Sequence, residues 1–344
     1  MTKASTSRVA VIVPNWNGKD VLPACLNSLQ SQSLKPHIVV VENGSTDGSE
    51  KLIAARYPQV TVLSQSKNLG FAGGVNVGIT HALDRDYKYV ALFNNDAVAD
   101  KNWLKELVKT LDKNSEAGIA TCSFLSSDGK RFDSTGELYT IWGLSYPRGR
   151  EEPVSAAYAT QTYVFGASGG ASLYRTTMLQ QIGLFDEKFF AYYEDVDLSF
   201  RAQLAGWKVV YAPEAIAYHK IGATSSRIKG FATYQTMKNL PMLFWKNVPL
   251  GLIPYILPRL FIVYWAFVAS SILKGKGWPA LKGLLIYLKN QPYVFKERRK
   301  IQKSKTVSNT YIWGMMTHDL PQNAYRLRVL RAKWWKLKGR KLAA

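Results

Sequence analysis

Cysteine, histidine and acidic residues are all scarce in this chain of 344 residues. It holds two cysteines, four histidines and 24 acids, against 45 Lys and Arg. Cys25 and Cys122 form no CxxC pair, so we expect neither a disulfide framework nor a cysteine metal site. No apolar stretch of signal-peptide length precedes the first expected strand, which predicts that the main domain stays in the cytoplasm. A hydrophobic content of 47% excludes a disordered chain and allows one large domain with an appendage.

The excess of basic residues is concentrated near the end of the sequence. From Lys274 onward, 18 Lys and Arg face only Glu297 and Asp319, which accounts for +16 of the net charge of +21. Such a segment attracts phosphate, whether in nucleic acid or on an anionic membrane. Six of the ten tryptophans lie from Trp245 onward, interleaved with basic residues as in 333–336. Because Trp and basic side chains together favour the lipid headgroup layer, we expect an anionic membrane surface as the partner, and no nucleic acid.

Residues 240–273 are strongly apolar, with Lys246 and Arg259 as their charges. The uncharged run 260–273 has 14 residues, fewer than the roughly 20 that span a bilayer. Prolines, which interrupt helices, stand at four positions in this stretch: Pro241, Pro249, Pro254 and Pro258. The pattern predicts a helical, basic region over 236–344 that lies on the cytoplasmic face of the cell membrane, as a peripheral or monotopic attachment, after a globular domain over 1–235.

Short β-branched runs alternate with amphipathic stretches over the first 115 residues. We expect strands at 9–13, 38–41, 60–63 and 89–93, and helices at 21–30, 48–57, 74–83 and 103–114. This alternation predicts an α/β fold with parallel strands and crossover helices. Further helices are expected at 176–182 and 195–205. Residues 118–163 are irregular, which predicts extra strands and long loops that shape a substrate pocket.

Two amides and a carboxylate, Asn94, Asn95 and Asp96, follow the expected strand at 89–93. Open α/β sheets bind ligands beyond the carboxyl ends of their strands. Mg²⁺ takes one or two protein oxygens and completes its coordination with phosphate oxygens and water. The motif therefore suggests a divalent cation that holds a nucleoside diphosphate, although the same residues also favour a simple turn.

Four segments occur in order along the chain: VIVPNWNG, VVVENGSTDGS, NLGFAGGVNVG and LFNNDA. Together with YYEDVDL and a later histidine, they resemble the family 2 inverting glycosyltransferases of GT-A fold, in particular a bacterial rhamnosyltransferase-like branch. The resemblance covers about residues 8–225. It implies a Rossmann-like, nucleotide-binding mixed sheet, with a nucleotide-binding half at about 8–115 and an acceptor half at about 116–235.

The resemblance also implies the residues that bind the donor. They are Pro14, Asn15, Asn17, Glu42, Asn43, Ser45, Asn68, Gly70, Asn76, Asn94, Asn95, Gly169 and Gly170. Glu42 stands where the family usually has Asp, and a carboxylate there can accept the imide N–H of uracil or thymine. The glycine-rich segment that opens at Gly70 enters a helix, where a close backbone and a helix N-terminus favour phosphate.

Asp96 and His219 are the metal ligands that the resemblance implies, with Mg²⁺ or Mn²⁺ as the cofactor. Asn94 replaces the first acid of the family's DxD motif, and its neutral amide binds a hard cation less strongly. Asp96 should therefore carry the contact. His219 follows an apolar run, and from the residues alone a hydrogen-bonded structural histidine is the alternative.

Glu194 and Asp195 match the family's catalytic acid pair. The resemblance implies that Asp195 is the general base that deprotonates the acceptor hydroxyl. Glu194 would then bind acceptor hydroxyls, or raise the pKa of Asp195 through like-charge repulsion. Asp197 is expected to be a helix-start charge or the partner of Arg201.

The predicted function is inverting, metal-dependent sugar transfer from a nucleoside diphosphate donor to a lipid-linked saccharide in bacterial cell-envelope glycan synthesis. The first expectation for the donor is dTDP-L-rhamnose; the alternative is another UDP-, dTDP- or GDP-sugar with a different acceptor. A sugar nucleotidyltransferase is disfavoured, because the first turn has no glycine-rich loop with a basic residue. A non-catalytic lipid- or nucleic-acid-binding protein is disfavoured because Asp96, Asp195 and His219 occur together.

Overall fold

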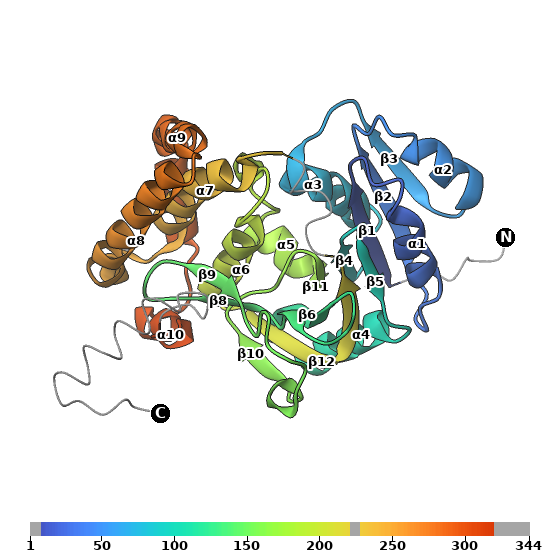
Figure 1. Ribbon diagram of the computed structural model, residues 1–344. Coiled ribbons are helices and arrows are strands. Elements are labelled where there is room, and N and C mark those ends of the chain that lie inside the picture. Colours follow the sequence, from blue (N-terminus) through green and yellow to red (C-terminus); the bar gives the residue numbers. More distant parts are fainter. Residues whose placement is uncertain (1–7, 221–227, 320–344) are drawn as a thin grey trace.

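A computed structural model describes residues 8–220 and 228–319 as a central mixed sheet flanked by helices (Figure 1). The main path of the sheet runs β10-β12-β6-β11-β4-β1-β2-β3, with β5 paired to β12 and β7 paired to β6. A separate hairpin joins β8 and β9. The strands are β1 (Val9–Asn15), β2 (His37–Asn43), β3 (Thr61–Gln65), β4 (Tyr89–Phe93), β5 (Ala97–Ala99), β6 (Ala117–Ser126), β7 (Phe132–Ser134), β8 (Glu137–Tyr139), β9 (Ser145–Pro147), β10 (Thr162–Val164), β11 (Ala171–Arg175) and β12 (Lys208–His219).

The strands β1 to β4 are parallel, which confirms the α/β fold predicted from the sequence. In their register Asn15 lies beside Glu42, so the polar residues that end β1 and β2 meet at one edge of the sheet. The antiparallel strand β11 then separates β4 from β6. The chain order along the sheet reverses between β1 and β4, and ligands bind beyond the carboxyl ends of strands at such a point in open α/β sheets.

Helices cover both faces of the sheet, which explains why the strands read as continuous apolar runs. Along β1, Val9, Val11 and Val13 pack in one core with residues of α1 and α4. Ala10 and Ile12 point to the other core, with residues of α3 and α6. The helices of this part are α1 (Leu22–Gln30), α2 (Ser49–Arg56), α3 (Gly70–Leu83), α4 (Trp103–Lys113), α5 (Thr176–Ile182) and α6 (Glu194–Leu204).

Two sequence-based expectations need correction in this part. The stretch from 118 onward is not irregular at its start, because β6 is a ten-residue strand buried between β11 and β12. Its pattern is obscured by Thr121 and Ser123, which are buried and bonded to other side chains. The helix expected at 74–83 begins at Gly70, and a Cβ on Gly78 would lie 2.3 Å from Ile12. That glycine therefore serves close packing of the helix on the sheet.

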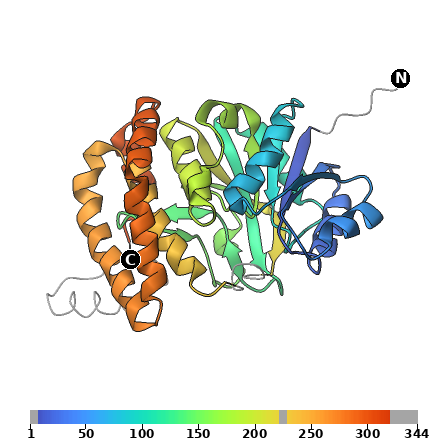
Figure 2. The same cartoon turned by 90° about the horizontal axis from the view of Figure 1, so that it is seen from above.

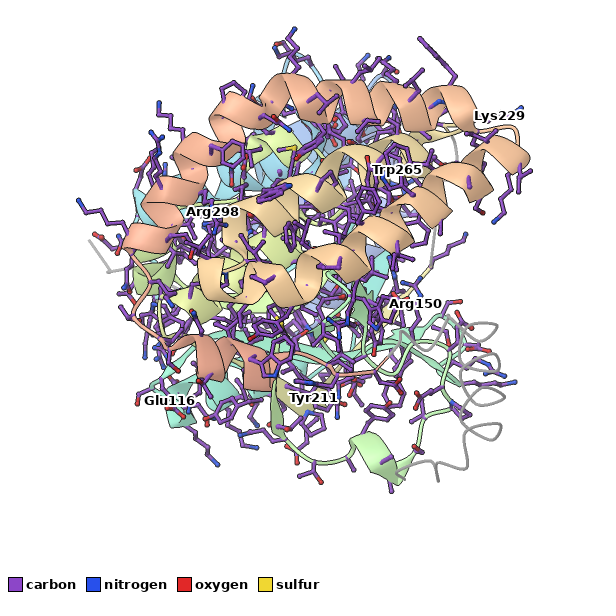
Figure 3. The ribbon with its side chains drawn as sticks, turned by 90° about the vertical axis from the view of Figure 1, so that its left-hand side faces the viewer. Glu116, Arg150, Tyr211, Lys229, Trp265 and Arg298 are labelled. Atoms are coloured by element: carbon purple, nitrogen blue, oxygen red, sulfur yellow. The ribbon has the colours of Figure 1, made fainter. Side chains whose placement is uncertain are left out.

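The remaining helices form a layer beside α6, at the end of the molecule opposite β3 (Figures 1 and 2). They are α7 (Phe231–Asn247), α8 (Ile253–Leu273), α9 (Gly277–Lys303) and α10 (Asn309–Met315), with short 3-10 turns at Ala156–Tyr158, Glu187–Phe189 and Leu250–Leu252 elsewhere. Phe200 of α6 shares a buried core with Leu243 and Phe244 of α7. Arg298 of α9, labelled in Figure 3, donates to the carbonyls of Trp245 and Val248 at the end of α7, both at 2.7 Å.

The prolines interrupt the helices only in part as the sequence suggested: Pro249 lies in the break between α7 and α8, and Pro254 lies in the first turn of α8. Pro241 lies inside α7 and Pro258 inside α8. Packing within the helical layer outweighs the one backbone hydrogen bond that each proline removes. One segment, Leu250–Leu273, is consequently long and apolar enough to cross a membrane by length and composition, and 22% of its most apolar window is buried. The basic aromatic stretch 333–336 lies outside the described residues.

Candidate active site

A cavity of about 780 Å³ lies between the carboxyl edge of the sheet and the start of α6. Asp96 and Asp195, which stand 99 positions apart in the sequence, both line it. Thirteen of the seventeen predicted site residues share this lining: Pro14, Asn15, Asn43, Asn68, Gly70, Asn94, Asn95, Asp96, Gly169, Gly170, Glu194, Asp195 and His219. The fold thus brings the predicted metal end and acid end into one cavity.

The other four predicted residues, Asn17, Glu42, Ser45 and Asn76, are not part of this lining. Glu42 is buried and accepts hydrogen bonds from Asn15 and from Ser49 Oγ, and burial raises its pKa. The Asn17 backbone N–H donates to Ser45 Oγ at 3.0 Å, which joins the turns after β1 and β2. Their contact with a donor stays a prediction.

Asn76 ties α3 to the segment after α5. Its Nδ2 donates to the Phe185 carbonyl at 2.8 Å, and its Oδ1 accepts from the Phe185 N–H at 3.0 Å. Both capacities of the amide are thus used inside the protein, and donor contact by Asn76 likewise stays a prediction.

The sheet wall of the cavity is a network of amides. Asn95 Nδ2 donates to Asn15 Oδ1 at 2.7 Å. Asn43 accepts from the Leu69 N–H at 2.8 Å and donates to the Gly70 carbonyl at 2.9 Å. Because these amides bond one another or backbone groups, the wall is preformed before a ligand arrives.

Gly70 lies where the sheet wall of the cavity meets the segment that precedes α6. Its φ is +76°, and a Cβ there would lie 2.4 Å from the Phe190 carbonyl oxygen, so only glycine fits. The Gly70 N–H donates to Asn68 Oδ1 at 2.8 Å. The first turn of α3 is thereby held against the segment that precedes α6.

Asp96 and His219 form the predicted metal end, with 3.3 Å between Asp96 Oδ1 and His219 Nε2. His219 Nδ1 lies 2.7 Å from Asp133 Oδ2, and its ring stacks on Phe124. Asp133 also pairs with Arg150 at 3.1 Å. Burial lowers the pKa of His219, but the hydrogen bonds and charges of Asp133 and Asp96 outweigh it and raise the pKa to about 9. A carboxylate behind a histidine ligand fixes its ring orientation and strengthens it as a ligand.

These residues fit a divalent cation that phosphate oxygens complete. Across 8–220 and 228–319, no group of three or more His, Cys, Asp or Glu side chains forms a ready metal cage. Asp96 offers one oxygen and His219 one nitrogen at the cavity wall. A small number of protein ligands is expected when a diphosphate supplies the remaining ligands of the cation. Asn94 lies beside them, with Nδ2 3.5 Å from His219 Nε2.

Glu194 and Asp195 form the acid end, at the first turn of α6. Asp195 accepts from the Gly169 N–H at 3.0 Å and the Val196 N–H at 2.8 Å. Glu194 Oε2 is buried without a hydrogen-bond partner among the described residues. Burial raises the pKa of both carboxyls, and the charge of Asp195 adds to the rise at Glu194, whose pKa lies well above its ordinary value. Asp195 is therefore the better candidate for the charged base.

The predicted pairing of Asp197 is confirmed. Asp197 is fully buried and lies 2.9 Å from Arg201 Nε. Lys246 of α7 contacts the same carboxylate at 2.8 Å, and these two cations lower the pKa of Asp197. Asp197 thus holds α6 to α7 and is absent from the cavity lining.

Sequence reasoning missed three charged residues in the cavity, namely Asp133, Glu137 and Arg150. Burial and the charge of Asp195 raise the pKa of Glu137 well above its ordinary value, which makes it a third carboxyl at the acid end. All three come from the segment with short strands β7 to β9, where three-residue elements leave no periodic pattern to read.

Comparisons with known proteins agree with this geometry. Residues 10–183 match the family model described as Glycosyl transferase family 2. N-acetylglucosaminyl-diphospho-decaprenol L-rhamnosyltransferase of Mycobacterium tuberculosis is 29% identical over 243 residues, which cover 64% of this chain and 78% of that protein. Polyprenol monophosphomannose synthase of Mycolicibacterium smegmatis is 23% identical over 232 residues, or 65% of this chain and 82% of that protein.

Solved structures share the fold at low sequence identity. The mannosyltransferase PcManGT of Pyrobaculum calidifontis, in complex with GDP-Man and Mn²⁺, has a TM-score of 0.51 at 17% identity and covers 88% of this chain and 84% of its own. GalNAc-T7, solved with UDP, GalNAc and Mn²⁺, has a TM-score of 0.60 at 14% identity and covers 84% of this chain and 57% of its own. These likenesses establish the GT-A fold that the sequence predicted.

Proposed function

Because this chain belongs to glycosyl transferase family 2, we propose that it transfers a sugar, with inversion, from a nucleoside diphosphate to a lipid-linked saccharide in bacterial cell-envelope glycan synthesis. For the donor we propose dTDP-L-rhamnose first. The observation that carries the proposal is the single cavity with Asp96 and His219 at one end and Asp195 at the other. The 29% identical relative, whose name specifies an L-rhamnosyltransferase and a diphospho-decaprenol acceptor, supports the choice of both substrates.

Asp96 and His219 would hold Mg²⁺ or Mn²⁺, and Asp133 would keep the imidazole of His219 aimed at the cavity. When bound, such a cation neutralises the charge of the departing diphosphate. The amides of the sheet wall, Asn43 and Asn68, hold the first turn of α3, whose backbone N–H groups favour the phosphates.

Asp195 takes the proton from the acceptor hydroxyl. The hydroxyl oxygen then forms a bond to the anomeric carbon on the face opposite the diphosphate, and the bond from that carbon to the diphosphate oxygen breaks, so the configuration inverts. Glu194, whose pKa burial and the charge of Asp195 raise, would bind a hydroxyl of the acceptor sugar. General base catalysis of this kind contributes about 10²- to 10⁴-fold to the rate.

The helices α8 and α9 would hold the cavity at the membrane where the acceptor lies. On α9, large apolar side chains recur at helical spacing on an exposed stripe: Trp278, Leu281, Leu285, Leu288 and Phe295. Exposed lysines follow three of them directly, at Lys282, Lys289 and Lys296. Trp265 of α8, labelled in Figure 3, is also exposed. An apolar stripe bordered by lysines matches an anionic lipid surface.

We propose that α8 lies in the interface of the cytoplasmic leaflet and does not span the bilayer. A turn of three residues joins α8 to α9, so the two helices run side by side in opposite directions (Figure 3). A spanning α8 would carry Lys282 and Lys289 of α9 into the hydrocarbon core, which is costly. In addition, Ile256, Leu260 and Tyr264 of α8 are buried within the protein.

The test of the proposed function is nucleoside diphosphate release by the purified full chain. The protein is incubated with Mn²⁺ or Mg²⁺ and a panel of UDP-, dTDP- and GDP-sugars, with and without lipid-linked saccharide, and with EDTA as the metal-free control. We expect release that requires both the cation and the acceptor, fastest with dTDP-rhamnose, and a product with inverted anomeric configuration by NMR. Release with none of the sugars, or full activity in EDTA, would overturn the proposal.

A further inference from the structure

The catalytic acids follow a turn of unusual backbone conformation. Phe190, Tyr192 and Tyr193 all have positive φ, at 65°, 66° and 71°. Bulky residues rarely adopt this left-handed region, and such conformations persist only where the surroundings enforce them. Asp195 lies two residues beyond the turn, so its position depends on what holds the turn in place.

A buried asparagine of α7 bonds the carbonyls of this turn. Asn239 Nδ2 lies 3.0 Å from the Phe189 oxygen, 2.9 Å from the Ala191 oxygen and 2.8 Å from the Tyr192 oxygen. The neighbouring Lys238, also buried, donates from Nζ to the carbonyls of Lys188 at 2.9 Å and Phe189 at 3.1 Å. Two adjacent side chains of one helix thus reach four carbonyls in a stretch of five residues.

The helix that carries these donors is itself firmly anchored. Lys246, the next-to-last residue of α7, is buried between Asp186 and Asp197, and its Nζ lies 2.8 Å from Asp197 Oδ1. Tyr293 of α9 donates to Asp186 at 2.9 Å. Asn239 and Lys238 therefore act from a rigid base.

We infer that Asn239 and Lys238 are positioning residues, which hold the turn at 189–193 so that Asp195 meets the acceptor hydroxyl. The inference rests on the proposed function. Phe190, Ala191 and Tyr192 themselves line the cavity, so release of the turn would move both the cavity wall and the acid beside it. The helical layer thereby takes part in building the active site.

The experiment compares two buried amides that have similar tasks and different locations. Asn239→Leu removes the donors to the turn. Gln203→Leu is the matched control, because Gln203 is also fully buried and donates to two backbone carbonyls, those of Val164 and Phe165, which are outside the cavity lining. For each variant we measure the melting temperature, the affinity for nucleoside diphosphate with Mn²⁺, and kcat for transfer at a temperature where both are folded.

We expect Asn239→Leu to lower kcat by about 100-fold, the loss expected for a misplacement of about 1 Å. Donor affinity should change less than threefold, and Gln203→Leu should keep kcat within twofold at a similar loss of melting temperature. Lys238→Met should also lower kcat. If Asn239→Leu does not fold, the kcat of Lys238→Met tests the inference in its place. Equal kcat values for the wild type and the folded α7 variants, or parallel loss in Gln203→Leu, would overturn the inference.

Hydrogen exchange separates this inference from the proposed function. The amides of Tyr192–Asp197 should exchange faster in Asn239→Leu than in the wild type, and at the wild-type rate in Gln203→Leu. If the wild type transfers no sugar, the proposed function fails. If the amide exchange rates in Asn239→Leu equal those of the wild type, the positioning role of Asn239 is refuted.

Discussion

The sheet wall of the cavity is lined by neutral amides, whereas the wall built by α6 is lined by buried carboxyl groups. Asn15, Asn43 and Asn95 have hydrogen-bond partners within the protein and lie at or just beyond the ends of regular strands. Glu194 and Asp195 follow a left-handed turn that a separate helix holds. The amides of the first wall are held by groups of the sheet and of the start of α3, whereas the second wall depends on α7.

Under the proposed function, this difference would separate the binding of the donor from the chemical step. A wall of satisfied amides can hold a ligand with little reorganisation and no change of charge. A buried carboxyl group is less favourable when charged, so burial makes Asp195 a stronger base than an exposed carboxylate. Changes in the first wall should therefore alter donor affinity, and changes in the second should alter turnover.

The largest predicted effect comes from Asp195→Asn, which keeps the shape of the side chain and removes the base. We expect kcat to fall by about 10³-fold while donor affinity stays unchanged. Asn68→Ala, on the opposite wall, should weaken donor affinity by about fivefold with little effect on kcat. Steady-state kinetics and calorimetric binding of the nucleoside diphosphate check both variants. If each variant changed kcat and donor affinity equally, the two walls would not have separate roles.

Asp133→Asn comes next, because it weakens the support of His219 without removing a ligand. We expect about a 10- to 100-fold higher concentration of Mn²⁺ for half-maximal activity. Asp128→Asn is the matched control, since Asp128 lies in the turn just before β7 and bonds only local groups in the described structure. If both variants needed the same Mn²⁺ concentration as the wild type, Asp133 would have no role behind the metal.

Reversal of charge along α9 should release the protein from membranes. The triple change Lys282→Glu, Lys289→Glu and Lys296→Glu should lower partition into vesicles that contain anionic lipid by more than tenfold, since each lysine near such a surface contributes about 1 kcal/mol. Activity on a water-soluble acceptor should stay near wild type, because these residues are not part of the cavity lining.

The control for that experiment changes the same net charge on another face. It replaces three exposed lysines of α2 and the start of α4 with Glu: Lys51, Lys101 and Lys105. Partition equal to the wild type is expected, and equal loss in both triple variants would mean that net charge alone governs binding. Truncation of the helical layer is a poorer test, since it removes buried residues such as Lys246 and Phe244.

The smallest predicted effect is on the pH profile. Asp195 must be deprotonated to act, and burial raises its pKa, so kcat should rise with pH through a value above the ordinary carboxyl pKa of about 4. The profile is measured at saturating Mn²⁺ and donor. An acid limb at or below the ordinary value would argue against Asp195 as the base.

The first wall could be predicted from the sequence, and the second only in part. Asn15 and Asn43 end strands with clear β-branched patterns and Asp96 follows a third, so their meeting at one edge follows from parallel pairing. Glu194 and Asp195 were found by resemblance of a local motif. Their supports could not be found, since Asn239 lies in an apolar helix that was expected at the membrane.

Residues 118–163 were the hardest to read, for a physical reason. Asp133 and Glu137 stand in three-residue strands, which pair with β6 and β9 and are too short to show a periodic pattern. At Pro258 the local rule was clear but wrong. It predicted a break in the helix, and tertiary packing keeps the helix continuous. Local patterns thus located the sheet and its edge, and long-range contacts determined the rest of the site.

Mn²⁺-dependent binding and sugar transfer, measured side by side in Asp96→Ala and Asp195→Asn, test the central claim most directly. If one cavity holds a cation-bound diphosphate at one end and the base at the other, Asp96→Ala loses the Mn²⁺-dependent gain in nucleoside diphosphate affinity. Asp195→Asn keeps that gain and loses transfer. Unchanged Mn²⁺-dependent binding in Asp96→Ala, or normal transfer by Asp195→Asn, would contradict the account.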